Sequence, residues 1–165
     1  LNYLAYMWAE RGENLDEALE FVNRALALVP ESGAFVDTLG WIYFMKGEYE
    51  LARTEIEKAT VLLPDDATIM DHLGDVWLKL DERDKAMDTW RRAFVLDPTN
   101  EKVGEKLTRQ GIALEPLRVE ADEYRATVEA SAEIKAAEGE TEVAGEATVN
   151  EVPEVAPVPE PASKE

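Results

Sequence analysis

The stretch that decides the fold is residues 34–64, AFVDTLGWIYFMKGEYELARTEIEKATVLLP. Two stripes of small and apolar residues follow helical spacing along it: Val36, Leu39, Gly40 and Tyr43, then Ala52, Ile56 and Ala59. Gly47 lies between the stripes, and Pro64 forbids the second helix from continuing. The stretch therefore predicts two helices joined by a turn, with Gly and Ala allowing their backbones to approach closely.

The same pattern recurs at a step of 34 residues, which is the spacing of Pro30, Pro64 and Pro98. A period of 34 is the signature of a helix-turn-helix repeat array. We expect repeats at 1–32, 33–66 and 67–100, and a charged capping helix at 101–110 that closes an array spanning 1–111. The expected helices within the repeats are 1–11, 15–28, 34–46, 49–62, 67–79 and 83–96.

Polar residues mark the expected helix starts. Asn14 and Glu17 have capping-box spacing, and Asp66 and Asn100 are candidate N-caps. Asp65, next to Asp66, is also interpreted as a cap. After the array, the thin apolar stripe of residues 117–128 predicts a marginal helix within 112–137. Residues 138–165 are acidic and rich in proline, which predicts a disordered tail.

Charge and composition exclude several classes of protein. The 165 residues carry a net charge of −19, which disfavours nucleic acid and anionic membrane surfaces as partners. With no Cys and a single His, thiolate and multi-histidine metal sites are excluded. No apolar run approaches the roughly 18 residues that span a bilayer, so we expect no membrane insertion. The chain begins at Leu1 rather than Met, which we interpret as a cut point, and the compartment stays open.

Residues 34–64 closely resemble a tetratricopeptide repeat (TPR). The positions that carry the resemblance are Val36, Leu39, Gly40, Tyr43, Gly47, Tyr49, Ala52, Ile56, Ala59 and Pro64. The next repeat matches at most places but has Asp81 and Arg83 at the turn glycine and the following aromatic. The resemblance implies an all-α, right-handed superhelical α-solenoid of antiparallel helix pairs, with about three repeats and a capping helix.

The resemblance also implies a concave groove, lined by the first helix of each repeat, that holds a peptide or helix. The implied groove residues are Asn2, Tyr3, Tyr6, Asp37, Thr38, Trp41, Phe44, Met45, Thr68, Asp71, His72, Asp75 and Lys79. Their aromatic and acidic character favours a partner protein or peptide with basic or amphipathic character. For Trp41 and Phe44, packing against adjacent repeats is an equally good interpretation.

Two narrower sites are disfavoured. The family's carboxylate clamp uses Lys, Arg and Asn at places that here hold Tyr6, Thr38 and His72, with Asn2 as a partial match. His72 between Asp71 and Asp75 is weak support for a metal or an acid–base pair, and Asp75 with Lys79 has ordinary ion-pair spacing. We expect no metal, no cofactor and no catalytic residues.

The sequence therefore predicts a non-enzymatic interaction scaffold. The alternative is a structural spacer within a larger protein, such as one of bacterial envelope assembly or secretion. For the acidic tail, solvation, partner binding and tethering all remain open.

Overall fold

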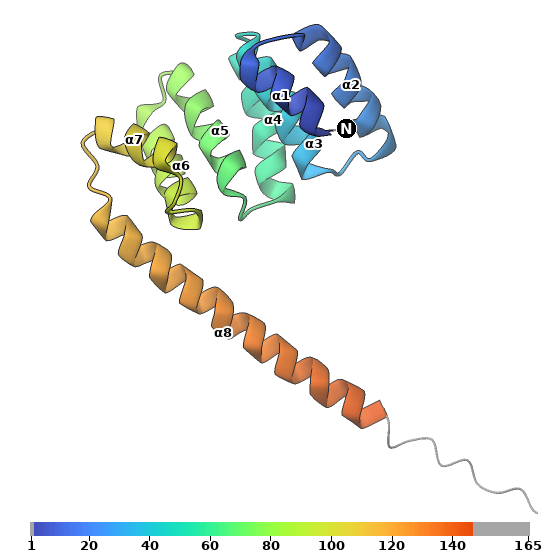
Figure 1. Cartoon of the computed structure of the whole chain (residues 1–165), viewed down its shortest axis with the longest axis vertical. Coiled ribbons are helices and arrows are strands. Elements are labelled where there is room, and N and C mark those ends of the chain that lie inside the picture. The colour runs from blue at the N-terminus through green and yellow to red at the C-terminus, as the bar shows by residue number, and fades with distance from the viewer. Residues whose placement is uncertain (1, 147–165) are drawn as a thin grey trace, which may run out of the picture. The chain divides into compact units, whose positions relative to one another are not determined.

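The structure is a computed structural model that describes residues 2–146, with side chains through residue 136. These residues form helices and no strand (Figure 1). The helices are α1 (Asn2–Arg11), α2 (Leu15–Leu28), α3 (Gly33–Met45), α4 (Tyr49–Leu62), α5 (Ala67–Lys79), α6 (Arg83–Leu96), α7 (Glu101–Arg109) and α8 (Glu115–Glu146). One compact unit is Leu1–Arg125, and a second begins at Ala126 within α8.

Helices α1 to α6 pack as three consecutive pairs, α1 with α2, α3 with α4, and α5 with α6. The pairs follow one another from right to left in Figure 1, and α3 also packs against α1 and α2. The first seven helices begin and end within one residue of the ranges expected from the sequence. The all-α, repeat-solenoid prediction is therefore confirmed.

Glycines on the first helix of a pair receive bulky side chains from the second. A Cβ placed on Gly40 would lie 2.4 Å from Ile56 Cγ1, and one on Gly74 would lie 2.4 Å from Trp90 Cδ1. Ile56 and Trp90 are buried, at 0% and 2% exposure. The small residues thus allow close helix packing, and an added methyl group should cost about 1–3 kcal/mol.

The helix starts agree only in part with prediction. Asp66 accepts hydrogen bonds from the Thr68 and Ile69 amides at 2.9 and 3.1 Å, and Asn100 accepts one from Val103 at 3.3 Å. The capping box predicted at Asn14 is wrong, because Asn14 has a left-handed φ of 48° and its side chain caps nothing.

The first repeat has one extra residue between its turn and α2, and the left-handed Asn14 accommodates that residue in the connection. Asp65 is not a cap either. Its carboxylate instead accepts a hydrogen bond from Arg92 of α6 at 2.8 Å. That ion pair links the connection before α5 to the second helix of the same pair.

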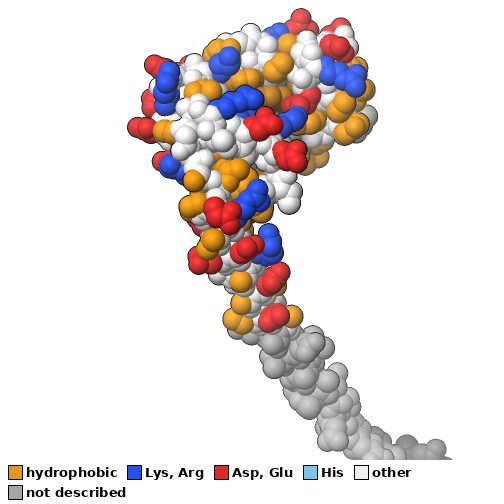
Figure 2. Space-filling view, turned by 60° about the vertical axis from the view of Figure 1, so that its left-hand side comes forward, with side chains coloured by type: hydrophobic (Ala, Val, Ile, Leu, Met, Phe, Trp, Pro, Cys, Tyr) orange, Lys and Arg blue, Asp and Glu red, His pale blue; other side chains and the backbone are white. Residues whose placement is uncertain are grey.

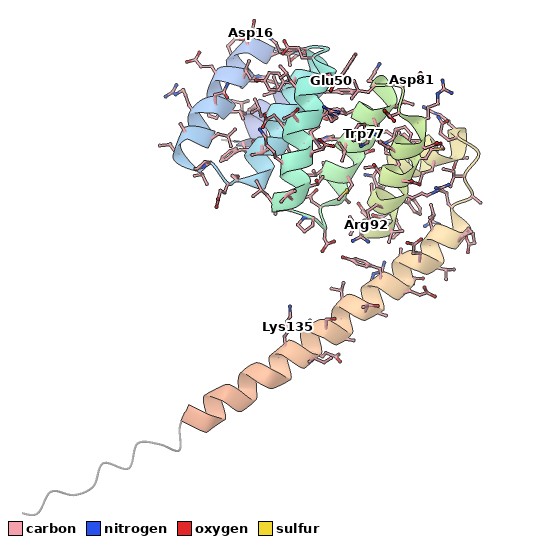
Figure 3. All side chains as sticks on the ribbon, turned by 180° about the vertical axis from the view of Figure 1, so that it is seen from behind. Asp16, Glu50, Trp77, Asp81, Arg92 and Lys135 are labelled. Atoms are coloured by element: carbon pink, nitrogen blue, oxygen red, sulfur yellow. The ribbon has the colours of Figure 1, made fainter. Side chains whose placement is uncertain are left out.

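Trp77 of α5, labelled in Figure 3, packs in the interior between α4 and α6. The Arg53 guanidinium of α4 and the Lys85 ammonium of α6 lie 5.9 and 4.5 Å from its ring centroid. Such cation–π contacts contribute about 0.5–2 kcal/mol each, depending on burial. Trp77 therefore connects two successive pairs through electrostatics as well as packing.

The first turns of α8 pack on the array. Leu117 and Ala121 are buried, and Tyr124 packs against the same core cluster. The Arg92 guanidinium lies 4.7 Å from the Tyr124 ring centroid, and Arg118 donates a hydrogen bond to the Pro98 carbonyl at 3.3 Å. These contacts anchor α8 on the C-terminal part of α6.

The helix predicted within 112–137 continues further, because α8 ends at Glu146. Residues 129–146 are rich in Ala and Glu, which are good helix formers and favour a helix here. The side chains of residues 129–136 are all exposed. The rest of the predicted tail, 147–165, lies outside the described residues. None of the helices in the described part of the chain is long and apolar enough to cross a membrane.

Candidate functional site

The predicted groove residues lie on α1, α3 and α5 and differ widely in exposure. Asp37, Thr38, Trp41 and His72 are buried; Asn2, Tyr6, Phe44, Asp71 and Asp75 are half-buried; Tyr3, Met45, Thr68 and Lys79 are exposed. Periodicity on a single helix identifies the face of a residue but not how deeply the next repeat covers it. The structure therefore separates a buried floor from an accessible surface.

The buried rings of the floor, Trp41 and His72, belong to a series of ring contacts that crosses three pairs of helices and ends at the half-buried Tyr6 and Phe44. Tyr6 of α1 lies 6.0 Å from His72 of α5, and His72 stacks on Trp41 of α3 at 4.1 Å between centroids. Trp41 stacks in turn on Phe44 at 4.5 Å with an interplanar angle of 7°. Because neighbouring rings stack on it and its exposure is only 8%, Trp41 packs between repeats.

Asp37 and His72 form a buried polar pair at this floor. His72 Nδ1 lies 2.9 and 3.0 Å from the two carboxylate oxygens of Asp37. Burial lowers the pKa of His72, but the charge of Asp37, the hydrogen bond to it and the more distant Asp71 and Glu10 outweigh burial. The net effect is a raised pKa, so the imidazolium form is stabilised within the array.

A second charged cluster surrounds Lys106 of α7. Its ammonium donates to Asp71 at 2.6 Å and lies 2.7 Å from the nearer oxygen of Asp75. Burial raises the pKa of Asp75, and the opposing effect of Lys106 does not compensate for it. The predicted pairing of Asp75 with Lys79 is wrong, because Lys106 reaches Asp75 and Lys79 lies 5.9 Å from the Tyr49 ring centroid.

The two clusters are the same contact one repeat apart. Asp37 and Asp71 are 34 residues apart, as are their cationic partners His72 and Lys106. At the preceding joint, between α1 and α3, the Asn2 amide donates to the Ala34 carbonyl at 3.3 Å. Thr38, at the place equivalent to His72, donates its hydroxyl to the same carbonyl within its own helix at 2.8 Å. A polar ladder of three joints therefore connects the first helices of successive pairs.

Lys106 is the residue of this ladder that sequence reasoning missed. The charged residues of 101–110 predict a capping helix, and that prediction does not assign Lys106 a partner. The repeat register carries the missing signal, since Lys106 lies 34 residues after His72 and thus occupies the equivalent place. A charged residue on the last helix of the array can therefore lie in the interface with the preceding repeat.

Tyr6 borders the ladder and is half-buried. Burial and the carboxylates of Glu10 and Asp37 raise the pKa of its hydroxyl, so the ring stays neutral and can act as a hydrogen-bond donor. Among the described side chains, no group of three or more His, Asp or Glu is arranged to hold a metal ion. On the face seen in Figure 2, Lys and Arg lie interspersed with Asp and Glu, with apolar side chains between them.

The paired helices, their 34-residue register and the joints between first helices define a helical-repeat solenoid. Comparison with solved structures shows that its fold is that of a tetratricopeptide-repeat domain. No protein-family model matches the sequence, and no curated protein matches it significantly.

Three of the similar structures illustrate the match. The first TPR of Spaghetti (RPAP3), bound to the HSP90 peptide SRMEEVD, has a TM-score of 0.59 and 17% identity, covering 66% of this chain and 85% of that one. MamA has a TM-score of 0.56 and 24% identity, covering 81% and 77%. The Yersinia enterocolitica type III secretion translocator chaperone SycD has a TM-score of 0.56 and 21% identity, covering 72% and 89%.

Proposed function

We propose that this chain is a non-enzymatic protein-interaction scaffold that holds an amphipathic, basic peptide or helix against the first helices of its repeats. The observation that carries the proposal is an accessible rim, by which we mean the exposed and half-buried aromatic and methionine side chains on α1 and α3, two of the helices that carry the ring series. Tyr3 is 75% exposed, Met45 is 36% exposed, and Tyr6 and Phe44 are half-buried. Exposed tyrosine and methionine side chains offer apolar contact area suited to the apolar face of a helix.

The charge of the same surface supports a basic partner. Asp71 and Asp75 share a single ammonium, that of Lys106, so this cluster has one carboxylate in excess. Glu10, exposed on α1, adds a further negative charge beside Tyr6. Opposite charge on a partner would mainly increase the rate and specificity of association.

The similar structures support the proposal as analogy. A TPR domain with the same fold binds an HSP90 peptide, and that peptide, SRMEEVD, ends in acidic residues. In this chain Tyr6, Thr38 and His72 occupy the places where the family's clamp has Lys, Arg and Asn, and two of the three are buried. A basic partner is therefore the better hypothesis for this surface.

Titration with two defined peptides tests the proposal. One is an amphipathic peptide of Leu and Lys, and the other has Glu in place of every Lys. Fluorescence anisotropy should show binding of the Lys peptide alone, weakened by salt. Met45→Lys should weaken it about tenfold, since it removes apolar contact and adds a like charge.

Val61→Lys is the matched control, because Val61 is 81% exposed on the second helix α4 and the charge change is the same. That variant should bind normally, and circular dichroism should show unchanged helicity for both. Equal binding of the two peptides, or equal weakening by the two variants, would contradict the proposal and favour the structural-spacer alternative.

A further inference from the structure

A cavity of about 770 Å³ lies beside α7, away from the rim described above. Phe94, Gly104, Thr108 and Leu114 line its apolar part, and Arg109 and Arg118 are among the charged side chains around it. All of these residues belong to the unit Leu1–Arg125. The cavity is therefore a feature of the repeat array and of the segment that leads into α8.

The repeat register explains why the cavity is there. In the two preceding pairs, the equivalent place on the first helix is Gly40 or Gly74, and Ile56 or Trp90 from the second helix fills the space against it. Thr108 follows Gly74 by 34 residues, yet it is exposed and lines the cavity. The position that a second helix covers in each earlier pair is open on α7.

Helix α8 does not cover this position because its first turns are anchored elsewhere. Arg118 lies 5.3 Å from the Phe94 ring centroid and donates to Pro98, while Tyr124 contacts Arg92. Its buried residues Leu117 and Ala121 join the core cluster that includes Trp90 and Phe94 of α6. The slot on α7 consequently lacks the side chain that Ile56 or Trp90 supplies to the other pairs.

The side chains that fill the earlier slots share a spacing. Ala52 precedes Ile56 by four residues, and Ala86 precedes Trp90 by four, so a small residue and a bulky one share one helix face. All four are buried. An occupant of the open slot should therefore present a small residue followed four residues later by a large apolar residue.

The distal part of α8 carries that pattern on its surface. Ala130 and Ile134 are four residues apart, and both are exposed, Ile134 at 60%. The sequence ASAEIKAA at 130–137 has its Ala, Ile and final Ala at the same spacing as ARTEIEKA at 52–59 in α4. Both surfaces carry mixed charge around an apolar centre: Glu129, Glu133 and Lys135 lie beside this stripe, and Glu101, Glu105, Arg109 and Arg118 border the slot.

We propose that the Ala130–Ile134 stripe of α8 docks in the α7 slot of a second copy of this chain. Each copy has one slot and one stripe, so mutual exchange gives a closed dimer with two identical contacts. Each contact extends the array by the second helix that the fourth pair lacks. This interface is independent of the function proposed above, which concerns α1, α3 and α5.

Sedimentation velocity over about 1–500 µM tests the oligomeric state. The wild-type chain should shift from monomer to dimer as its concentration rises. Ile134→Asp, which places a charge in the slot, should raise the dimer dissociation constant at least about 100-fold. Val61→Asp, at a position on α4 that is 81% exposed, should leave it unchanged. A chain that stays monomeric throughout, or a dimer that Ile134→Asp does not weaken, would overturn the proposal.

Cysteine cross-linking identifies the contact, since the chain has no native Cys. A Thr108→Cys copy mixed with an Ile134→Cys copy should form a mixed disulfide dimer under mild oxidation. Self-linked Ile134→Cys copies as the main product would overturn the proposal in favour of pairing between two α8 helices. A double variant that links within a monomer, or the absence of any mixed dimer, would overturn it as well.

Discussion

The carboxylate of Asp37 and the imidazole of His72, 35 residues apart in sequence, are hydrogen-bonded in the buried joint between α3 and α5. Trp41 stacks on the same imidazole, and Tyr6 borders it. His72 is the only residue of its type in the chain, so its titration can be followed without interference. The titration of His72 therefore reports on the joint between α3 and α5.

Stability should fall as the pH rises through the titration of His72. Its folded pKa is raised above the ordinary value, so its contribution is fully present below about pH 6.5 and is lost above the folded pKa. Tyr6 stays neutral in this range because its own pKa is raised. Urea unfolding should give a lower free energy of unfolding at about pH 9 than at about pH 6.

His72→Gln is the control for that experiment, since an amide keeps a hydrogen-bond donor beside Asp37 but has no charge to lose. Its free energy of unfolding should vary little over the same range. An equally steep decline in His72→Gln would mean that other groups cause the pH dependence.

Lys106→Met should destabilise the array by about 2 kcal/mol or more, because it leaves Asp71 and Asp75 partly buried without a cation. Lys102→Met on the same helix provides the comparison, since Lys102 is exposed. That variant should change the free energy of unfolding by less than about 0.5 kcal/mol. Similar effects of the two variants in urea denaturation would show that the cluster contributes no stability.

Asp75→Asn should stabilise the chain at neutral pH by up to about 1 kcal/mol. Burial raises the pKa of Asp75, so the folded state disfavours the charged carboxylate that the unfolded chain carries freely. Lys106 would keep Asp71 as its partner. The gain should disappear when denaturation is repeated at a pH low enough to protonate Asp75 in both states, and a gain that persists there would contradict this cause.

Substitutions in the turns of two successive helix pairs should change stability in opposite directions. Gly47 has φ of 79° and open space around it, so Gly47→Ala should cost about 1 kcal/mol through backbone strain alone. Asp81 holds the equivalent left-handed place in the next pair with φ of 62°. Asp81→Gly should therefore be neutral or stabilising by up to about 1 kcal/mol, and thermal denaturation that ranks the two variants in the reverse order would refute the account.

Most of the fold could be predicted from the sequence because the repeat encodes it locally. Gly40 and Gly74 identify close helix contacts, and Pro30, Pro64 and Pro98 bound the repeats. The Asn14 cap was wrong because the extra residue of the first repeat changed the backbone path, although the sequence pattern looked favourable. The length of α8 depends on the intrinsic propensity of an Ala- and Glu-rich segment, which has weak periodicity.

Less of the site could be predicted. The repeat register predicts which face of a helix a side chain lies on, whereas its burial depends on how the next repeat covers that face. The sequence therefore could not distinguish buried Trp41 from accessible Met45. The partners of Asp37 and Asp71 lie 35 residues away, beyond the reach of spacing within a helix. Only alignment of the repeats against one another would have identified Lys106.

The ladder of joints also determines which repeats can be neighbours. Each joint has its own chemistry, amide with backbone carbonyl, carboxylate with imidazole, then carboxylate with ammonium. If residues 33–66 were duplicated in tandem, Asp37 of the first copy would face a second Thr38 and would have no cation beside it. Lengthening the array by simple duplication would therefore leave a buried carboxylate without its cation, which would destabilise the added joint.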